Sequence, residues 1–167
     1  MKPVFVPSAR ALVRVHDLPG RGVPIVFVHG LGCASSCDYP GVVREEPLAA
    51  RRAVLVDLPG SGFSDRPPDF AYTVSAHARV VEEAVDALEI PAIDLFGHSM
   101  GGAVAIEAAT RLGVRVRSLV LSEPNLDAGG GVFSRAIAAF TETDYVARGH
   151  EATAREAAAS GDRVWAG

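Results

Sequence analysis

The sequence has few cysteines, no basic block and no long apolar run, and each absence excludes a class of protein. Cys33 and Cys37 are the only cysteines in 167 residues, and no further ligands stand at a metal-binding spacing. We therefore expect no metal site and two reduced thiols, although a disulfide between them stays open. The net charge is −4 without a cluster of Lys or Arg, which argues against nucleic acid or a membrane surface as partner. Without a signal-peptide pattern or a membrane-span length, the expected location is the cytoplasm.

The composition, with 49% hydrophobic and 22% charged residues, is typical of a globular domain. Short apolar runs alternate with helix-type segments along the chain. Strands are predicted at 4–6, 12–15, 25–28, 53–56, 93–96 and 118–121, and helices at 42–51, 74–88 and 103–112. The segment 17–22 is a turn that could join a hairpin. This alternation predicts an α/β fold, with a mainly parallel, doubly wound sheet and helices on both faces.

One stretch carries the clearest chemical signal: Gly97-His98-Ser99-Met100-Gly101, between a predicted strand and a predicted helix. Gly-x-Ser-x-Gly in that setting is the pattern of a nucleophile elbow. The serine sits on a tight, strained turn, and glycines two positions away on either side avoid a collision. The alternative is a glycine-rich strand-to-helix turn with an incidental serine.

A second loop, His29-Gly30-Leu31-Gly32, follows the predicted strand at 25–28. Its glycines let a backbone amide approach a ligand closely. An oxyanion hole needs two such amides, one from the residue after the nucleophile and one from this loop, so we assign the amides of Leu31 and Met100. A phosphate cradle is the alternative, but the loop lacks its glycine spacing.

Two acidic residues follow predicted strands. Asp57 stands before Leu-Pro-Gly-Ser-Gly, where its carboxylate is expected to bond nearby amides in a turn rather than to take part in catalysis. Glu123 stands at the carboxyl end of the last predicted strand, where a triad acid could orient a histidine. A solvated carboxylate at the start of a loop is the alternative for Glu123.

In this order, the three loops resemble the α/β-hydrolase fold family over about residues 3–125. The resemblance implies a Ser–His–acid triad, an oxyanion hole, no cofactor and an acyl-enzyme. Relatives that open epoxides or remove halide usually carry aspartate where this chain has Ser99, so the implied substrates are esters, amides, thioesters or related acyl compounds. Glu123 matches the members whose acid follows the sixth strand. Leu31, Met100 and Phe133 would make the near site apolar and suited to a small acyl group.

The resemblance covers only the N-terminal part of the family's fold. Residues 1–124 would form the core, truncated after about the sixth strand, and 125–167 the beginning of a helical lid. That lid would hold Gly129–Gly131 and helices at 133–140 and 151–159. The histidine that serves as base in the family lies near the end of the chain, and we find no counterpart for it.

None of the five histidines is an evident substitute. His29 and His98 are expected to support the site as structural or packed residues. His77 is expected to be solvated on its helix, and His16 to lie far from the site. His150 is the one histidine on a segment that could fold over the active edge.

Two function hypotheses follow. The first is a serine hydrolase that acts on a small-molecule acyl substrate and is inactive or partner-dependent as this chain. The second is a non-catalytic hydrolase-like module that binds a ligand or a protein. The predicted edge strand at 118–121 would leave backbone groups unpaired, which favours self-association or a complementing chain there.

Overall fold

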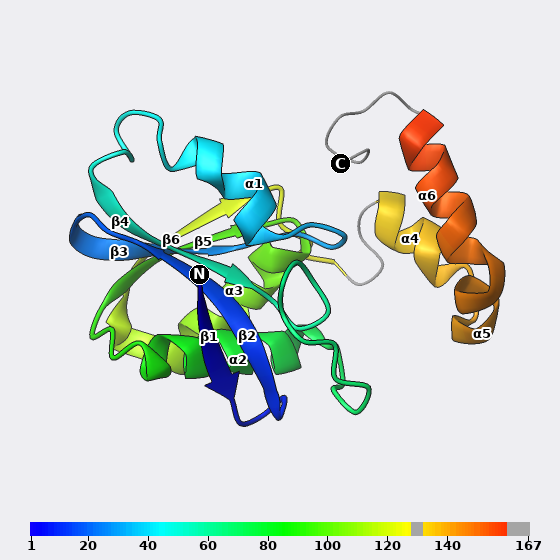
Figure 1. Ribbon diagram of the computed structural model, residues 1–167, viewed down its shortest axis with the longest axis horizontal. Helices are drawn as coiled ribbons and strands as arrows, with labels where there is room; N and C mark the ends of the chain where they lie inside the picture. The colour runs from blue at the N-terminus through cyan, green and yellow to red at the C-terminus, as the bar shows by residue number, and fades with distance from the viewer. Residues whose placement is uncertain (128–131, 160–167) are drawn as a thin grey trace. The chain divides into compact units, whose positions relative to one another are not determined.

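The computed structural model describes residues 1–127 and 132–159, and the chain divides into two compact units, Met1–Asn125 and Leu126–Gly167. The first unit is built on a six-stranded sheet with the order β1-β2-β4-β3-β5-β6 (Figure 1). Its strands are β1 (Lys2–Val6), β2 (Ala11–Leu18), β3 (Arg21–Val28), β4 (Arg51–Asp57), β5 (Ile93–His98) and β6 (Val116–Ser122). Every predicted strand is therefore present, two to four residues longer than predicted.

The sheet is mainly parallel, as predicted. Strands β3, β4, β5 and β6 run parallel, whereas β2 pairs antiparallel with both β1 and β4. The hairpin suggested for the turn at 17–22 is wrong, because β2 and β3 are not neighbours. The apolar run at 25–28 is buried throughout and suits a central strand, while β2 alternates buried Val13 and Val15 with less buried Arg14 and His16.

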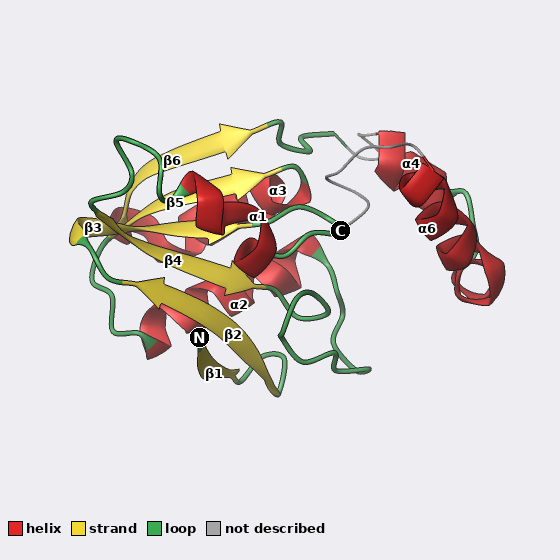
Figure 2. Ribbon diagram, turned by 45° about the horizontal axis from the view of Figure 1, so that its top comes forward, coloured by secondary structure: helices red, strands yellow, loops and turns green. Residues whose placement is uncertain are grey.

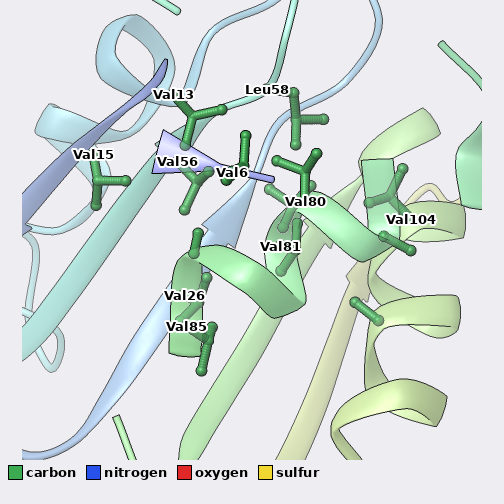
Figure 3. Close-up of a cluster of buried hydrophobic side chains, with 14 of the residues drawn as sticks. Val6, Val13, Val15, Val26, Val56, Leu58, Val80, Val81, Val85 and Val104 are labelled. Atoms are coloured by element: carbon green, nitrogen blue, oxygen red, sulfur yellow. The ribbon is translucent and has the colours of Figure 1, made fainter. Parts of the chain in front are cut away.

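Helices cover both faces of the sheet, which confirms the doubly wound prediction (Figure 2). Helix α1 (Ser35–Val42) lies on one face, where Tyr39 packs with Phe27 and Leu55. Helices α2 (Val74–Ala87) and α3 (Met100–Leu112) lie on the other face, and α3 leads through the short helix η1 (Gly113–Arg115) into β6. The larger core on this second face is rich in valine (Figure 3). Burial of such side chains is the main source of stability, at roughly 1.5–3 kcal/mol each.

The helix predicted at 42–51 is wrong. Helix α1 ends at Val42, and turns occupy the residues up to β4. Pro47 lacks the amide that a continuing helix would use. Helix α1 itself has little helical periodicity, and tertiary contacts hold it: the Ser35 hydroxyl donates to the Phe27 carbonyl at 3.1 Å, and Ser36 bonds to Asp57.

Helix α2 begins with a side-chain cap. The Thr73 hydroxyl accepts a hydrogen bond from the Ala76 amide at 3.1 Å, which satisfies one of the free amides of the first turn. The helix ends at Ala87, one residue before the predicted end. Its buried face packs on the valine-rich core and includes His77, Ala78, Val81 and Val85.

The second unit is helical in its described part. It contains α4 (Val132–Ala138), α5 (Glu142–Asp144), the π-helical turn η2 (Tyr145–Gly149) and α6 (His150–Ala159). The helices predicted at 133–140 and 151–159 are thus present within two residues, while Gly129–Gly131 lie outside the described residues. The assignment of this unit as a lid stays a prediction. Among the described helices, none combines the length and apolar character that crossing a membrane requires.

Candidate active site

Ser99 occupies the strained position that the sequence predicts for it. Strand β5 ends at His98, α3 begins at Met100, and Ser99 between them has φ 52° and ψ −122°. Left-handed backbone is unfavourable for a residue with a side chain and persists only where its surroundings hold it. Here the Ser99 amide donates to the Ser122 carbonyl at 3.0 Å, while the Ser99 carbonyl accepts from the amides of Gly102 and Asn125 at 2.9 and 3.1 Å.

The glycines around Ser99 are required by close approaches of backbone. A Cβ at Gly97 would collide with the carbonyl oxygen of Gly101, and a Cβ at Gly101 would collide with the carbonyl oxygens of Val28 and His29. A Cβ at Gly102 would lie 2.6 Å from the Cβ of Pro124. Strand β5, helix α3 and the end of β3 therefore meet with no room for side chains, and this contact fixes the turn that carries Ser99.

The loop after β3 lies directly against this turn. A Cβ at Gly30 would be 3.2 Å from both the Ser99 Cβ and the His98 Nδ1. Gly32 has φ 75°, a conformation that favours glycine. Leu31, between these glycines, lines the same pocket as Met100. Met100 is the first residue of α3, so its amide is one of the helix N–H groups without an intrahelical partner.

That pocket has a volume of about 300 Å³. It is lined by Leu31, Gly32 and Met100, by the loop 58–61 after β4, and by two aromatic residues, Tyr72 and His77. Leu31 and Met100 thus line the same pocket, and its role as the near site for an acyl group stays a prediction. The side chain of Phe133 lies outside the described residues.

His29 is fixed in the protein interior. Its Nδ1–H donates to the Gly30 carbonyl at 2.8 Å, and its Nε2 accepts from the Leu58 amide at 3.1 Å. Burial lowers the pKa of His29, so the ring stays neutral with one defined tautomer. Both nitrogens are occupied in holding the loop after β3 to the loop after β4, which fits the structural role expected for this residue.

Asp57 behaves as the turn residue that the sequence predicts. Its fully buried carboxylate accepts hydrogen bonds from the Ser36 amide at 2.9 Å, the Ser36 hydroxyl at 2.8 Å and the Phe63 amide at 3.1 Å. The carboxylate thus ties the loop after β4 to the start of α1 and is not available to a catalytic histidine.

Glu123 lies at the carboxyl edge of the sheet, next to the elbow. It follows β6, has φ 47°, and its side chain is 88% exposed. Its Oε2 is 4.0 Å from the Nε2 of His98, whose side chain is 37% exposed. This carboxylate is therefore free to meet a further group. Its role as triad acid stays a prediction.

The expectation that His77 is solvated is wrong. His77 is 5% exposed, its ring packs on Phe70 and Tyr72 with centroids 5.1 and 6.0 Å away, and it lines the pocket. Burial, with repulsion from nearby His29, lowers its pKa to about 4. The signal in the sequence is its helical spacing, because positions 77, 80, 81 and 84 share one face of α2.

The remaining histidines, His16 and His150, belong to different units of the chain. His16 lies on β2, opposite Leu55 of β4, and His150 begins α6 in the second unit. Within the described first unit, no histidine nitrogen is hydrogen-bonded to the Ser99 hydroxyl. The contacts of this unit therefore supply no general base to Ser99.

Comparison with known proteins identifies the family. Residues 23–167 match the α/β hydrolase fold family, so the chain belongs to it, as the three loops predict. The 2-hydroxy-6-oxo-2,4-heptadienoate hydrolase of Pseudomonas putida is 38% identical over 115 residues, 64% of this chain and 39% of that protein. Haloalkane dehalogenase 2 of Mycobacterium bovis is 34% identical over 112 residues, 65% of this chain and 37% of that protein.

Solved structures agree with this assignment. A meta-cleavage product hydrolase from Pseudomonas fluorescens has 28% sequence identity and a TM-score of 0.65, covering 74% of this chain and 45% of its own. An N-acyl homoserine lactonase reaches a TM-score of 0.73 at 22% identity, which supports the fold alone. The chain spans about two fifths of the length of the curated relatives that it matches.

Proposed function

We propose that this chain carries the nucleophile and oxyanion hole of a serine hydrolase that cleaves a small acyl substrate through an acyl-enzyme. The observation that carries the proposal is the strained backbone of Ser99. The Met100 amide follows it at the start of α3, and the loop after β3, which contains Leu31 between two glycines, lies against it at Gly30. Ser99 attacks the substrate carbonyl, and the amides of Leu31 and Met100 stabilise the negative charge on its oxygen. The first turn of α3 adds a favourable dipole at the same place.

The relatives support hydrolysis but differ in the bond that they cleave, since they include a hydrolase of an oxo-dienoate and a haloalkane dehalogenase. Serine at position 99 favours cleavage of an acyl compound over dehalogenation. Glu123 would orient a histidine that takes the proton from Ser99, as its exposed carboxylate permits. The described residues of the first unit hold no histidine hydrogen-bonded to Ser99, so the proposal assigns this histidine to a segment outside that unit or to a second chain.

A labelling experiment tests the nucleophile. With imidazole added as an external base, we expect a fluorophosphonate probe to modify the protein at Ser99 and to leave Ser99→Ala unmodified. Ser75→Ala is the matched control, because Ser75 is exposed on α2 and lies outside the site. Labelling of Ser99→Ala at the rate of the unmodified sequence would contradict the assignment.

Turnover of p-nitrophenyl butyrate separates an enzyme from a binding module. With added imidazole as an external base, we expect the chain to exceed Ser99→Ala in rate, and in an enzyme with its own base the difference should reach about 10³-fold or more. Equal rates for both proteins, with and without imidazole, would favour the non-catalytic module.

A further inference from the structure

Strand β6 is the last strand at one edge of the sheet, and no described strand pairs with its outer side (Figure 2). From Ser118 to Ser122 it runs in unbroken register with β5. The Ser122 carbonyl accepts from the Ser99 amide on the β5 side, so the alternate residues Leu119 and Leu121 direct their backbone groups to the outer side. Unpaired backbone groups of this kind are a template for a further strand.

The side chains of this edge are apolar where they meet solvent. Leu119 is 37% exposed and Val120 is 53% exposed. Val120 is in register with Phe96 of β5, which packs against the rings of Phe27 and Tyr39, so Val120 continues this apolar surface to the rim of the sheet. Edge strands are commonly protected by a charge or a proline, and the segment 118–122 has neither.

The residue order of β6 is self-complementary in one antiparallel register. If two copies pair about a two-fold axis at Val120, the two Val120 side chains meet at the axis. Leu119 then lies opposite Leu121 of the partner subunit, and these are the residues whose backbone groups point outward. At the next positions, Ser118 lies opposite Ser122 of the partner subunit. Each apolar side chain therefore meets an apolar one and each hydroxyl meets a hydroxyl.

Charges at the two ends of β6 fit the same register. An axis at Val120 places Arg117 opposite Glu123 of the partner subunit, and the side chains of Arg117 and Glu123 are 59% and 88% exposed. With the axis at Leu119, Arg117 would face leucine. With the axis at Leu121, Glu123 would face leucine. Exposed ion pairs add little affinity, but they select one register over its neighbours.

We propose that this chain forms a two-fold symmetric dimer, in which β6 pairs antiparallel with β6 of a second copy about an axis at Val120. The pairing satisfies the outward backbone groups of Leu119 and Leu121, covers Val120 and joins the two sheets into one. A two-fold contact uses the same surface on both copies and therefore closes at two. The dimer does not rest on the proposed function, because association requires no substrate.

Sedimentation of the chain over a range of concentrations tests the association. We expect a monomer–dimer equilibrium in the micromolar range, with slow hydrogen exchange at the amides of Leu119 and Leu121 in the dimer. Val120→Lys should weaken the dimer about 100-fold or more, because two like charges would meet at the axis. Val114→Lys is the matched control and should leave the dimer unchanged, because Val114 is fully exposed in η1, outside the pairing.

A charge exchange tests the register. Arg117→Glu and Glu123→Arg should each weaken the dimer about tenfold, because each places like charges opposite one another at both ends. The double variant Arg117→Glu/Glu123→Arg should return the dissociation constant to within about threefold of the unmodified value. Such a recovery cannot come from a folding defect, so it keeps the test valid even if Val120→Lys fails to fold.

Four results would overturn the dimer. They are a chain that stays monomeric at about 100 µM, assemblies larger than two copies, a double variant no better than the single ones, and a monomer with slow exchange at Leu119. The last result would mean that another segment of the same chain covers the edge. Labelling of Ser99 is measured separately, so the dimer and the proposed function can each fail alone.

Discussion

Asp57 ends β4 and Glu123 follows β6, both at the carboxyl edge of the sheet, and the structure gives them opposite surroundings. The Asp57 carboxylate is fully buried and accepts three hydrogen bonds from Ser36 and Phe63. The Glu123 side chain is 88% exposed, and its nearest charged or titratable partner is His98 at 4.0 Å. An acid at a strand end is therefore a candidate for catalysis only if the fold leaves its oxygens free.

The largest expected effect is the loss of the Asp57 carboxylate. Asp57→Ala would leave the Ser36 and Phe63 amides without their acceptor and would free the loop after β4 from α1. We expect the free energy of unfolding to fall by about 3 kcal/mol, measured by urea denaturation. Asp57→Asn keeps the volume and one acceptor oxygen, so it should lose less. If Asp57→Ala lost less than about 1 kcal/mol of unfolding free energy, the Asp57 carboxylate would not be a structural group that differs from the free carboxylate of Glu123.

A smaller effect is expected at Gly62, which faces Asp57. Gly62 has φ 52°, and a Cβ there would collide with the Asp57 carboxylate. Gly62→Ala should cost about 2–3 kcal/mol of unfolding free energy, from left-handed strain and from the displaced carboxylate together. The measurement is the same denaturation experiment.

Gly22→Ala is the matched control for Gly62→Ala. Gly22 has φ 73°, but a Cβ there would meet nothing within 4 Å. This variant should lose only the conformational part, about 1 kcal/mol. The difference between the two losses of unfolding free energy then measures how strongly the fold resists displacement of the Asp57 carboxylate. Equal losses in both would mean that the carboxylate moves aside freely.

The sequence is informative where a pattern is local. Apolar runs predict all the strands of the sheet, and the spacing of Gly97, Ser99 and Gly101 predicts the strained turn. Both signals are contained in a few consecutive residues. The turn interpretation of Asp57 is confirmed for the Phe63 amide, which lies in the same loop, whereas the hydrogen bonds from Ser36 are a distant contact.

The sequence fails where structure depends on distant contacts. Helix α1 has no apolar periodicity and is held by Ser35 and Ser36, which bond to residues of β3 and β4. The burial of His77 depends on Phe70 and Tyr72, which belong to the loop before α2. The pairing of β2 with β4 instead of β3 depends on which strands take the centre of the sheet. None of these contacts can be read from neighbouring residues.

The smallest expected effect is at Glu123. Glu123→Gln removes an exposed charge that lies 4.0 Å from His98, so the free energy of unfolding should change by no more than about 0.5 kcal/mol. Glu123→Gly is the matched variant, because it relieves the left-handed backbone at φ 47° and should unfold at an equal or higher urea concentration. Stability that is unchanged in Glu123→Gln would leave the carboxylate free for the orienting role proposed for it. A loss above about 1 kcal/mol would mean that the Glu123 carboxylate, like that of Asp57, stabilises the fold and is not free for catalysis.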